Sequence, residues 1–335
     1  MSSIRRSLPV LGLAAASALV LAGCASGSAA GGEGDSGLSV VASTNVYGQI
    51  AEQIGGDLVQ VTSLVTNESQ DPHSFEPSAR DQLVVADADL VIENGGGYDA
   101  FIDALIDSSG SEAPVVTAVE HSHDWPENEG HDAESGEDAD HADESDHSDE
   151  ADDDHGHDHV EGFNEHVWYD PHTVVHVAEA VAVELAELDP DNADTYTANA
   201  EEFAGEIEAL EASLAELDGA HGGAEVFATE PVPGYLVAAA GLSDITPDAF
   251  SEAVEEGQDV APATLLESLE LIESGDVRVV ITNTQTAGAE TAQIIAEAEA
   301  RGIPTVAFSE TVPEGETYIS WMQANIAALT EVLDA

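Results

Sequence analysis

The sequence predicts an α/β protein of two lobes, each with a parallel sheet flanked by helices, joined by one long rigid helix. From Leu38 onward, short β-rich runs alternate with helical stretches, an order typical of parallel sheets covered by helices. The alternation is interrupted over residues 121–159 and then resumes, which indicates a second lobe. The roughly 300 residues after Leu38 are enough for two domains of ordinary size.

The first lobe is expected over residues 38–190 and the second over residues 220–335. The strands predicted from apolar, β-rich runs are 40–43, 59–64, 90–92 and 115–116 in the first lobe, then 226–228, 277–282 and 305–308 in the second. The predicted helices are 48–54, 78–86 and 98–106, then 262–274, 290–300 and 319–333.

The linking helix is expected over residues 191–219. Residues 192–217 contain no proline and a single glycine. Their apolar side chains recur at three- and four-residue steps, the period of one helix face: Ala200, Phe203, Ile207, Leu210, Leu214 and Leu217. Before them, residues 189–191 (DPD) supply a turn and an N-terminal cap.

The N-terminus indicates export. Arg5 and Arg6 precede an apolar run over residues 8–21, which is short for a membrane span but typical of a signal peptide, here residues 1–23. Residues 21–24 (LAGC) resemble the lipobox of bacterial lipoproteins, so Cys24 is expected to carry a lipid that holds the protein on the outer face of the bacterial cell membrane. The Gly-, Ser- and Ala-rich residues 24–37 predict a flexible tether.

The charge of the chain is extreme, with 69 acidic residues against five arginines and no lysine. Because phosphate binding needs a basic surface, nucleic acid is excluded as a partner, whereas cations are plausible ligands. Most of this acidity is expected to serve solubility.

Two histidine segments are similar to each other. The first is residues 71–77 (DPHSFEP), in which two prolines brace a loop that carries His73. The second is residues 164–171 (NEHVWYDP), in which His166 stands beside aromatic residues and before a proline. A lone loop histidine is a weak signal, but the repeated combination predicts two positioned imidazoles.

These segments resemble the DPHxFEP and HxWxDP motifs of the zinc/manganese class of solute-binding lipoproteins of ABC importers. The resemblance extends over nearly the whole mature chain, through residues 43–46 (STNV), 93–95 (ENG), 189–190 (DP) and 321–322 (WM). It implies two α/β lobes bridged by a helix, with a metal in the cleft. It also implies an importer permease with its ATPase as partner, a monomeric state and no enzymatic activity.

Two further ligands are implied by the same resemblance. Glu230, in residues 229–235 (TEPVPGY), stands where the family has His or Glu. Glu310, in residues 309–311 (SET), stands where the family usually has aspartate, so that a water could take its place. Together with His73 and His166, these carboxylates would form a charge-neutral cage for a divalent ion, two ligands from each lobe.

The identity of the metal stays open between zinc and manganese. In the family, a glutamate at the third position is more typical of manganese binders. Against this, residues 121–159 hold eight of the 13 histidines, an enrichment that the general acidity does not explain and that favours zinc. We expect this segment to be disordered without metal and to act as an accessory metal loop through these histidines: His121, His123, His131, His141, His147, His155, His157 and His159.

The sequence offers three further interpretations, each with less support. His172 and His176 are four residues apart at the start of a helical stretch, a spacing that can chelate, but they are expected only to flank the second motif. A secreted zinc hydrolase would need three ligands, an open position for water and a general base, and no separate acid/base constellation is evident. A surface adhesin is compatible with the anchor, but nothing specific in the sequence demands it.

Overall fold

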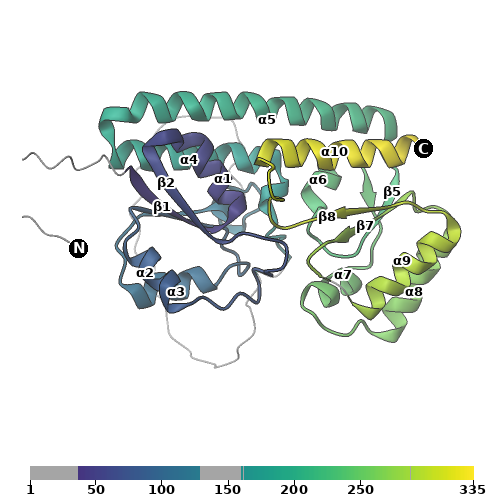
Figure 1. Ribbon diagram of the computed structural model, residues 1–335. Helices are drawn as coiled ribbons and strands as arrows, with labels where there is room; N and C mark the ends of the chain where they lie inside the picture. The colour runs from purple at the N-terminus through teal and green to yellow at the C-terminus, as the bar shows by residue number, and fades with distance from the viewer. Residues whose placement is uncertain (1–36, 129–159, 161, 287) are drawn as a thin grey trace, which may run out of the picture. The chain divides into compact units, whose positions relative to one another are not determined.

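The computed structural model describes residues 37–335 except 129–159, 161 and 287. Within them lie two four-stranded sheets, both entirely parallel, as the sequence predicts (Figure 1). The first sheet has the order β2-β1-β3-β4, with β1 Leu38–Thr44, β2 Val59–Val65, β3 Leu90–Glu93 and β4 Val115–Thr117. The second has the order β6-β5-β7-β8, with β5 Glu225–Ala228, β6 Ser243–Asp244, β7 Val279–Asn283 and β8 Thr305–Phe308.

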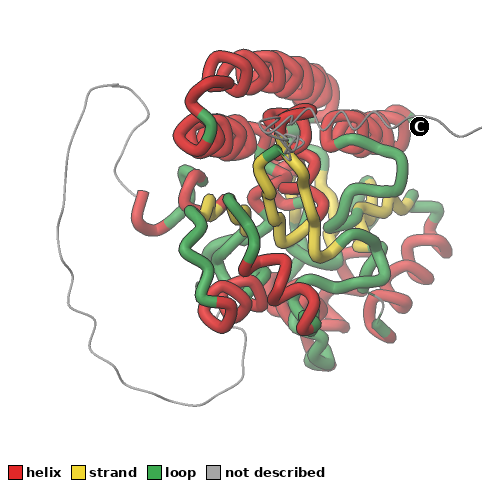
Figure 2. Tube along the Cα trace, turned by 60° about the vertical axis from the view of Figure 1, so that its left-hand side comes forward, coloured by secondary structure: helices red, strands yellow, loops and turns green. Residues whose placement is uncertain are grey.

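Helices lie on both sides of the strands (Figure 2). Those of the first lobe are α1 Asn45–Gly55, α2 Ala79–Ala86, α3 Phe101–Ser109 and α4 Pro171–Leu188. The long helix is α5 Ala193–His221, and those that follow are α6 Gly234–Ala239, α7 Asp248–Glu255, α8 Pro262–Ser274, α9 Ala289–Arg301 and α10 Tyr318–Asp334. The short 3-10 helices are η1 Gly56–Leu58, η2 Ala118–His121, η3 Pro126–Asn128, η4 Val167–Tyr169 and η5 Pro190–Asn192. The sequence did not anticipate β6, α6 or α7, all of which are short.

The first sheet is buried on both faces. Val40 and Ala42 of β1 pack in the cluster that contains α1, α4 and α5, whereas Val41 packs with residues of α2 and α3 such as Val85 and Phe101. Successive side chains of a strand point to opposite faces, and both faces are covered here. This is why β1 reads as a continuous apolar run and not as an alternating one.

The linking helix is confirmed. α5 buries the six residues of the apolar pattern seen in the sequence, and it also buries Tyr196. It packs against α1 and α4 of the first lobe and against α6 and α10 of the second. Before it, Asp189 accepts hydrogen bonds from Asn192 (2.6 Å) and from the Tyr196 hydroxyl (3.0 Å). The two lobes thus share one apolar core along this helix.

The carboxyl ends of the strands carry the polar segments. β3 is followed by Asn94 and three glycines with positive φ, while Glu230 and Glu310 stand two residues after the ends of β5 and β8. In open parallel sheets, ligands bind beyond the carboxyl ends of the strands. The fold therefore places these polar segments at the carboxyl ends of the two sheets, where a ligand can bind.

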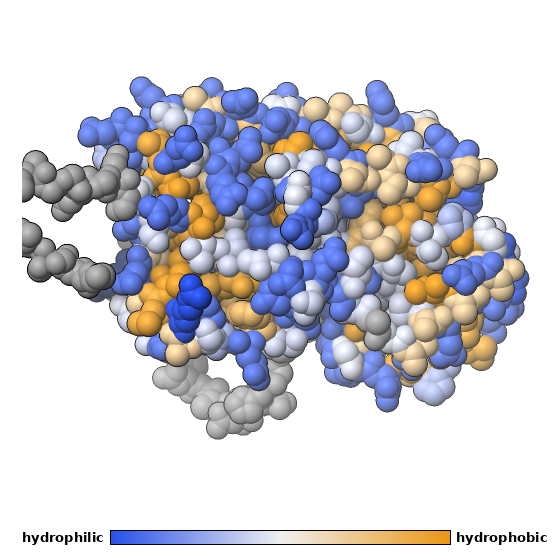
Figure 3. Space-filling model, viewed as in Figure 1, coloured by the Kyte–Doolittle hydropathy of each residue, from blue (hydrophilic) through white to orange (hydrophobic). Residues whose placement is uncertain are grey.

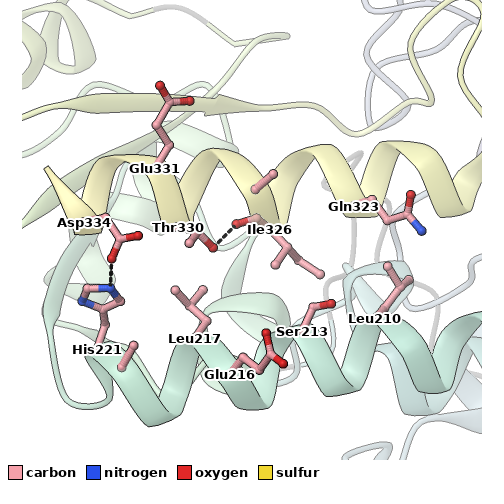
Figure 4. A pocket seen from close by; sticks show the side chains of 12 residues that line it. Leu210, Ser213, Glu216, Leu217, His221, Gln323, Ile326, Thr330, Glu331 and Asp334 are labelled. Atoms are coloured by element: carbon pink, nitrogen blue, oxygen red, sulfur yellow. Dashed lines mark hydrogen bonds and ion pairs between the residues drawn. The ribbon is translucent and has the colours of Figure 1, made fainter.

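Two surface features lie away from those strand ends. A groove of about 600 Å³ runs between α5 and α10 and is closed at one end by His221 and Asp334, whose side chains are 2.9 Å apart (Figure 4). Hydrophobic residues gather over α2 and α3 on the face in Figure 3, and Leu83 of α2 is 66% exposed. Among the described helices, none combines the length and the apolar character that crossing a membrane requires.

Candidate metal centre

His73 is positioned by the loop between β2 and α2. Its backbone N–H donates to Asp71 Oδ1 (2.9 Å), and the Ser74 hydroxyl donates to the other oxygen of the same carboxylate (2.8 Å). An aspartate that binds backbone two residues ahead closes a tight turn, and the neighbouring prolines restrict the loop further. The His73 ring packs edge-on against Tyr98, with 4.8 Å between ring centroids. The imidazole is thus held in position by the loop on one side and by the Tyr98 ring on the other.

His166 is fully buried, and Asn164 fixes its orientation. Asn164 Oδ1 lies 2.7 Å from His166 Nδ1 and also accepts the His166 backbone N–H (3.1 Å). The Asn164 amide is held in turn, because its Nδ2 donates to the Pro231 carbonyl (3.0 Å). An amide oxygen can only accept, so His166 Nδ1 carries the proton and Nε2 presents its lone pair.

The two imidazoles meet two glutamates that the sequence did not single out. The His73 and His166 ring centroids are 6.1 Å apart. One ligand atom from each of His73, Glu165, His166 and Glu255 lies within 4.8 Å of the others, and His166 Nε2 is 3.4 Å from Glu255 Oε1. Glu255 is the last residue of α7 and so comes from the second lobe. This compact group could hold a metal ion.

The two carboxylates taken from the resemblance, Glu230 and Glu310, lie alongside this group. Asn283 Nδ2 donates to both, at 2.9 Å to Glu230 and 2.6 Å to Glu310. The Thr286 hydroxyl donates to Glu230. Glu310 also accepts from the Tyr98 hydroxyl (3.1 Å), the same tyrosine that packs against both imidazoles. Glu230 and Glu310 are therefore close to the histidines but are engaged with protein donors.

The carboxylates of this centre are buried together. Burial is the main cause that raises the pKa of Glu310 to about 7, and repulsion from Glu230 adds to it. Burial likewise raises the pKa of Glu230 and of Glu255, and repulsion from Glu165, Glu230 and Glu310 contributes for Glu255.

No cationic side chain compensates this charge among the described residues. Three of the chain's arginines, Arg80, Arg278 and Arg301, lie in the described part, and none is among the groups that shift these pKa values. Uncompensated negative charge is costly in a buried site. A divalent cation would relieve this repulsion.

Sequence reasoning missed Glu165 and Glu255 for different reasons. Glu165 directly precedes His166 in the second motif, so its position was a usable signal. Glu255 stands in a helix that was not predicted and is one of 69 acidic residues, so nothing in the sequence distinguished it.

Other predicted site residues fall elsewhere. His121 and His123 are described but do not belong to the group around His166. His121 ends η2 and residues 126–128 form η3, while Trp125 between them packs against Phe163 with 5.1 Å between ring centroids. Cys24 and six histidines of the predicted accessory loop lie outside the described residues: His131, His141, His147, His155, His157 and His159.

Comparison with known proteins decides the family. Residues 40–332 match the family described as zinc-uptake complex component A, periplasmic (ZnuA). The chain belongs to this family. Solved structures with the same fold include one titled ZnuA, with 20% identity and a TM-score of 0.64 over 89% of this chain and 99% of that one. The periplasmic zinc-binding protein TroA from Treponema pallidum has 17% identity and a TM-score of 0.68 over the same shares.

The curated relatives of the chain include one named for manganese and one named for zinc. The chain is 29% identical to the manganese-binding lipoprotein MntA of Halalkalibacterium halodurans over 58% of its own length and 54% of that protein. It is 25% identical to the zinc-binding lipoprotein AdcA of Streptococcus pneumoniae over 96% of its own length and 60% of that protein. The chain thus spans little more than half the length of these two relatives. The resemblance inferred from the histidine motifs is confirmed.

Proposed function

We propose that the protein is an extracytoplasmic solute-binding protein that captures a divalent transition metal, with zinc as the preferred cargo, and delivers it to an ABC importer. The observation that carries this proposal is the convergence of two imidazoles, three buried carboxylates and the partly buried Glu255 carboxylate from both lobes. A cation bound there contacts both lobes at once, so binding stabilises their closed arrangement, which a membrane partner can recognise.

His73 and His166 supply the nitrogen ligands in this proposal, and Glu230 and Glu310 supply the carboxylates. Membership of the family and the position of both glutamates at strand ends support this quartet. Glu165 and Glu255 are the competing carboxylates, because they share the compact group with the histidines. Replacing Glu230 and Glu255 separately by glutamine distinguishes the two sets. The quartet requires the larger loss of affinity at Glu230.

Manganese is the second candidate cargo. Glu230 at the third position and the similarity to a manganese-binding lipoprotein favour it. Zinc is favoured by the histidine enrichment of residues 121–159 and by the affinity order of divalent metals, which places zinc above manganese at most nitrogen and oxygen sites. Competition between the two metals for the purified protein decides between them.

The importer partner, the anchor and the absence of catalysis complete the proposal. A permease with its ATPase receives the metal, and a lipid on Cys24 keeps the monomeric protein at the outer face of the cell membrane. The role is binding and not catalysis, because carboxylates and imidazoles that enclose the cation leave no open position for an activated water.

Metal titration of the purified protein tests the function. His73→Ala and His166→Ala each remove a nitrogen ligand. Each variant is expected to lose the tightly bound metal ion, while an unchanged circular dichroism spectrum shows that the protein is still folded. His221→Ala is the matched control, since that histidine faces Asp334 in the groove between α5 and α10 and should leave binding intact. Tight binding that survives in either cleft variant would sink the assigned centre.

A further inference from the structure

Four histidines gather on the surface around the start of α4, outside the centre described above. His172 and His176 stand on the first turns of α4. His121 and His123 come from the segment that follows β4 in the chain. The His123 and His172 ring centroids are 6.2 Å apart. His123 Nδ1 lies 3.6 Å from Asp170, the residue that caps the N-terminus of α4. Two separate stretches of chain thus bring imidazoles to one place.

The pair on α4 has the geometry of a chelate. Nε2 of His172 and Nε2 of His176 are 3.4 Å apart, with the rings perpendicular and their centroids 4.7 Å apart. Two nitrogens at 2.0–2.1 Å from a tetrahedral zinc ion are separated by about 3.3 Å. The spacing of four residues places both side chains on one helix face. A zinc ion can therefore bridge them with little change of either side chain.

Glu179 prepares His176 for this role. Its Oε2 lies 3.1 Å from His176 Nδ1. An ionised carboxylate only accepts hydrogen bonds, so His176 carries its proton on Nδ1 and directs the lone pair of Nε2 toward His172. A carboxylate behind a metal-binding imidazole fixes the ring and raises its basicity as a ligand.

His121 provides a separate sign of proximity. It is the last residue of η2, and η2 packs against α4, the helix that carries His172 and His176.

We propose that His172 and His176 form a second, solvent-exposed zinc site, completed by His121 and His123 and supported by Glu179. The set of nitrogen donors selects zinc over manganese, since manganese prefers oxygen ligands. His172 is exposed and His176 is 44% exposed at its side chain, so this site is weaker than the buried centre. It lies at the point where residues 121–128 meet α4, distinct from His73 and His166 in every ligand.

Zinc stoichiometry in the full-length protein tests the site. The parent variant carries asparagine in place of the six histidines from His131 to His159 that lie outside the described residues, so that only described histidines are counted. We expect two zinc equivalents in a titration with a chelator competitor, one tight and one weaker. Adding His172→Ala and His176→Ala to this parent is expected to remove the weaker equivalent and to leave the tight affinity unchanged.

Two further variants sharpen the result. Glu179→Gln is expected to weaken the second site about tenfold, because the supporting carboxylate is lost, and His221→Ala should retain both equivalents. One zinc in the parent, or two after His172 and His176 are removed, would overturn the proposal. Loss of the tight equivalent in the parent would instead contradict the function proposed for the buried centre, and so the two failures are distinguishable.

Discussion

Asn164 is expected to control metal affinity without touching the metal. Its Oδ1 accepts two hydrogen bonds from His166, from Nδ1 at 2.7 Å and from the backbone at 3.1 Å, and so holds both the tautomer and the orientation of a fully buried ring. Asn164→Ala removes both bonds. Loss of such a partner behind a metal-binding histidine costs 10- to 100-fold in affinity, or about 1.4–2.7 kcal/mol.

Isothermal titration of the folded variant with zinc, using a chelator competitor, measures this loss. Asn164→Asp is the matched variant, because it keeps the acceptor oxygen for His166 but loses the Nδ2 donor to the Pro231 carbonyl. We expect its affinity to stay close to that of the unaltered protein. Tight binding by Asn164→Ala, or an equal loss in both variants, would refute the reasoning that the acceptor at Nδ1 is what matters.

Three predictions concern stability, each measured by urea unfolding of the metal-free protein. Burial, with repulsion from nearby carboxylates, raises the pKa of Glu93 to about 8 from 4.5. Between these two pH values the folded state holds a proton that the unfolded state releases, so the free energy of unfolding falls as pH rises. Glu93→Gln should therefore be more stable than the unaltered protein by up to about 3 kcal/mol at pH 7, and its stability should depend less steeply on pH. An unchanged pH dependence would contradict this. Asn45 exchanges two hydrogen bonds with the Val312 backbone of the second lobe (2.8 and 3.0 Å), so Asn45→Ala should cost about 1–3 kcal/mol, and no loss would show that the pair contributes nothing. Gly241 has φ +66°, a backbone conformation that alanine rarely adopts, so Gly241→Ala should cost about 1 kcal/mol, whereas a neutral change would contradict this backbone argument.

The sequence alone predicted the architecture, and it singled out two of the four residues that form the compact group, His73 and His166. Parallel strands that are buried on both faces appear as short continuous apolar runs, and a helix buried along one face repeats its apolar residues at intervals of three and four residues. Both patterns lie within a short stretch of sequence and can be recognised without the tertiary structure. His73 and His166 were also recognisable, because each stands in a short motif whose proline, aspartate and aromatic residues determine the loop around it. Glu230 and Glu310 came from the resemblance to a family and not from any local pattern.

Only the tertiary structure decided which carboxylates meet the imidazoles. Glu255 reaches His166 because α7 ends beside the second motif, although 89 positions separate the two residues in the chain. The pairing of His172 with His176 needed the rotamers of both rings as well as their spacing. The physical reason is that an acidic chain offers many equivalent carboxylates, and a carboxylate becomes a candidate ligand only when packing buries it beside other donors, where its charge is no longer screened by water.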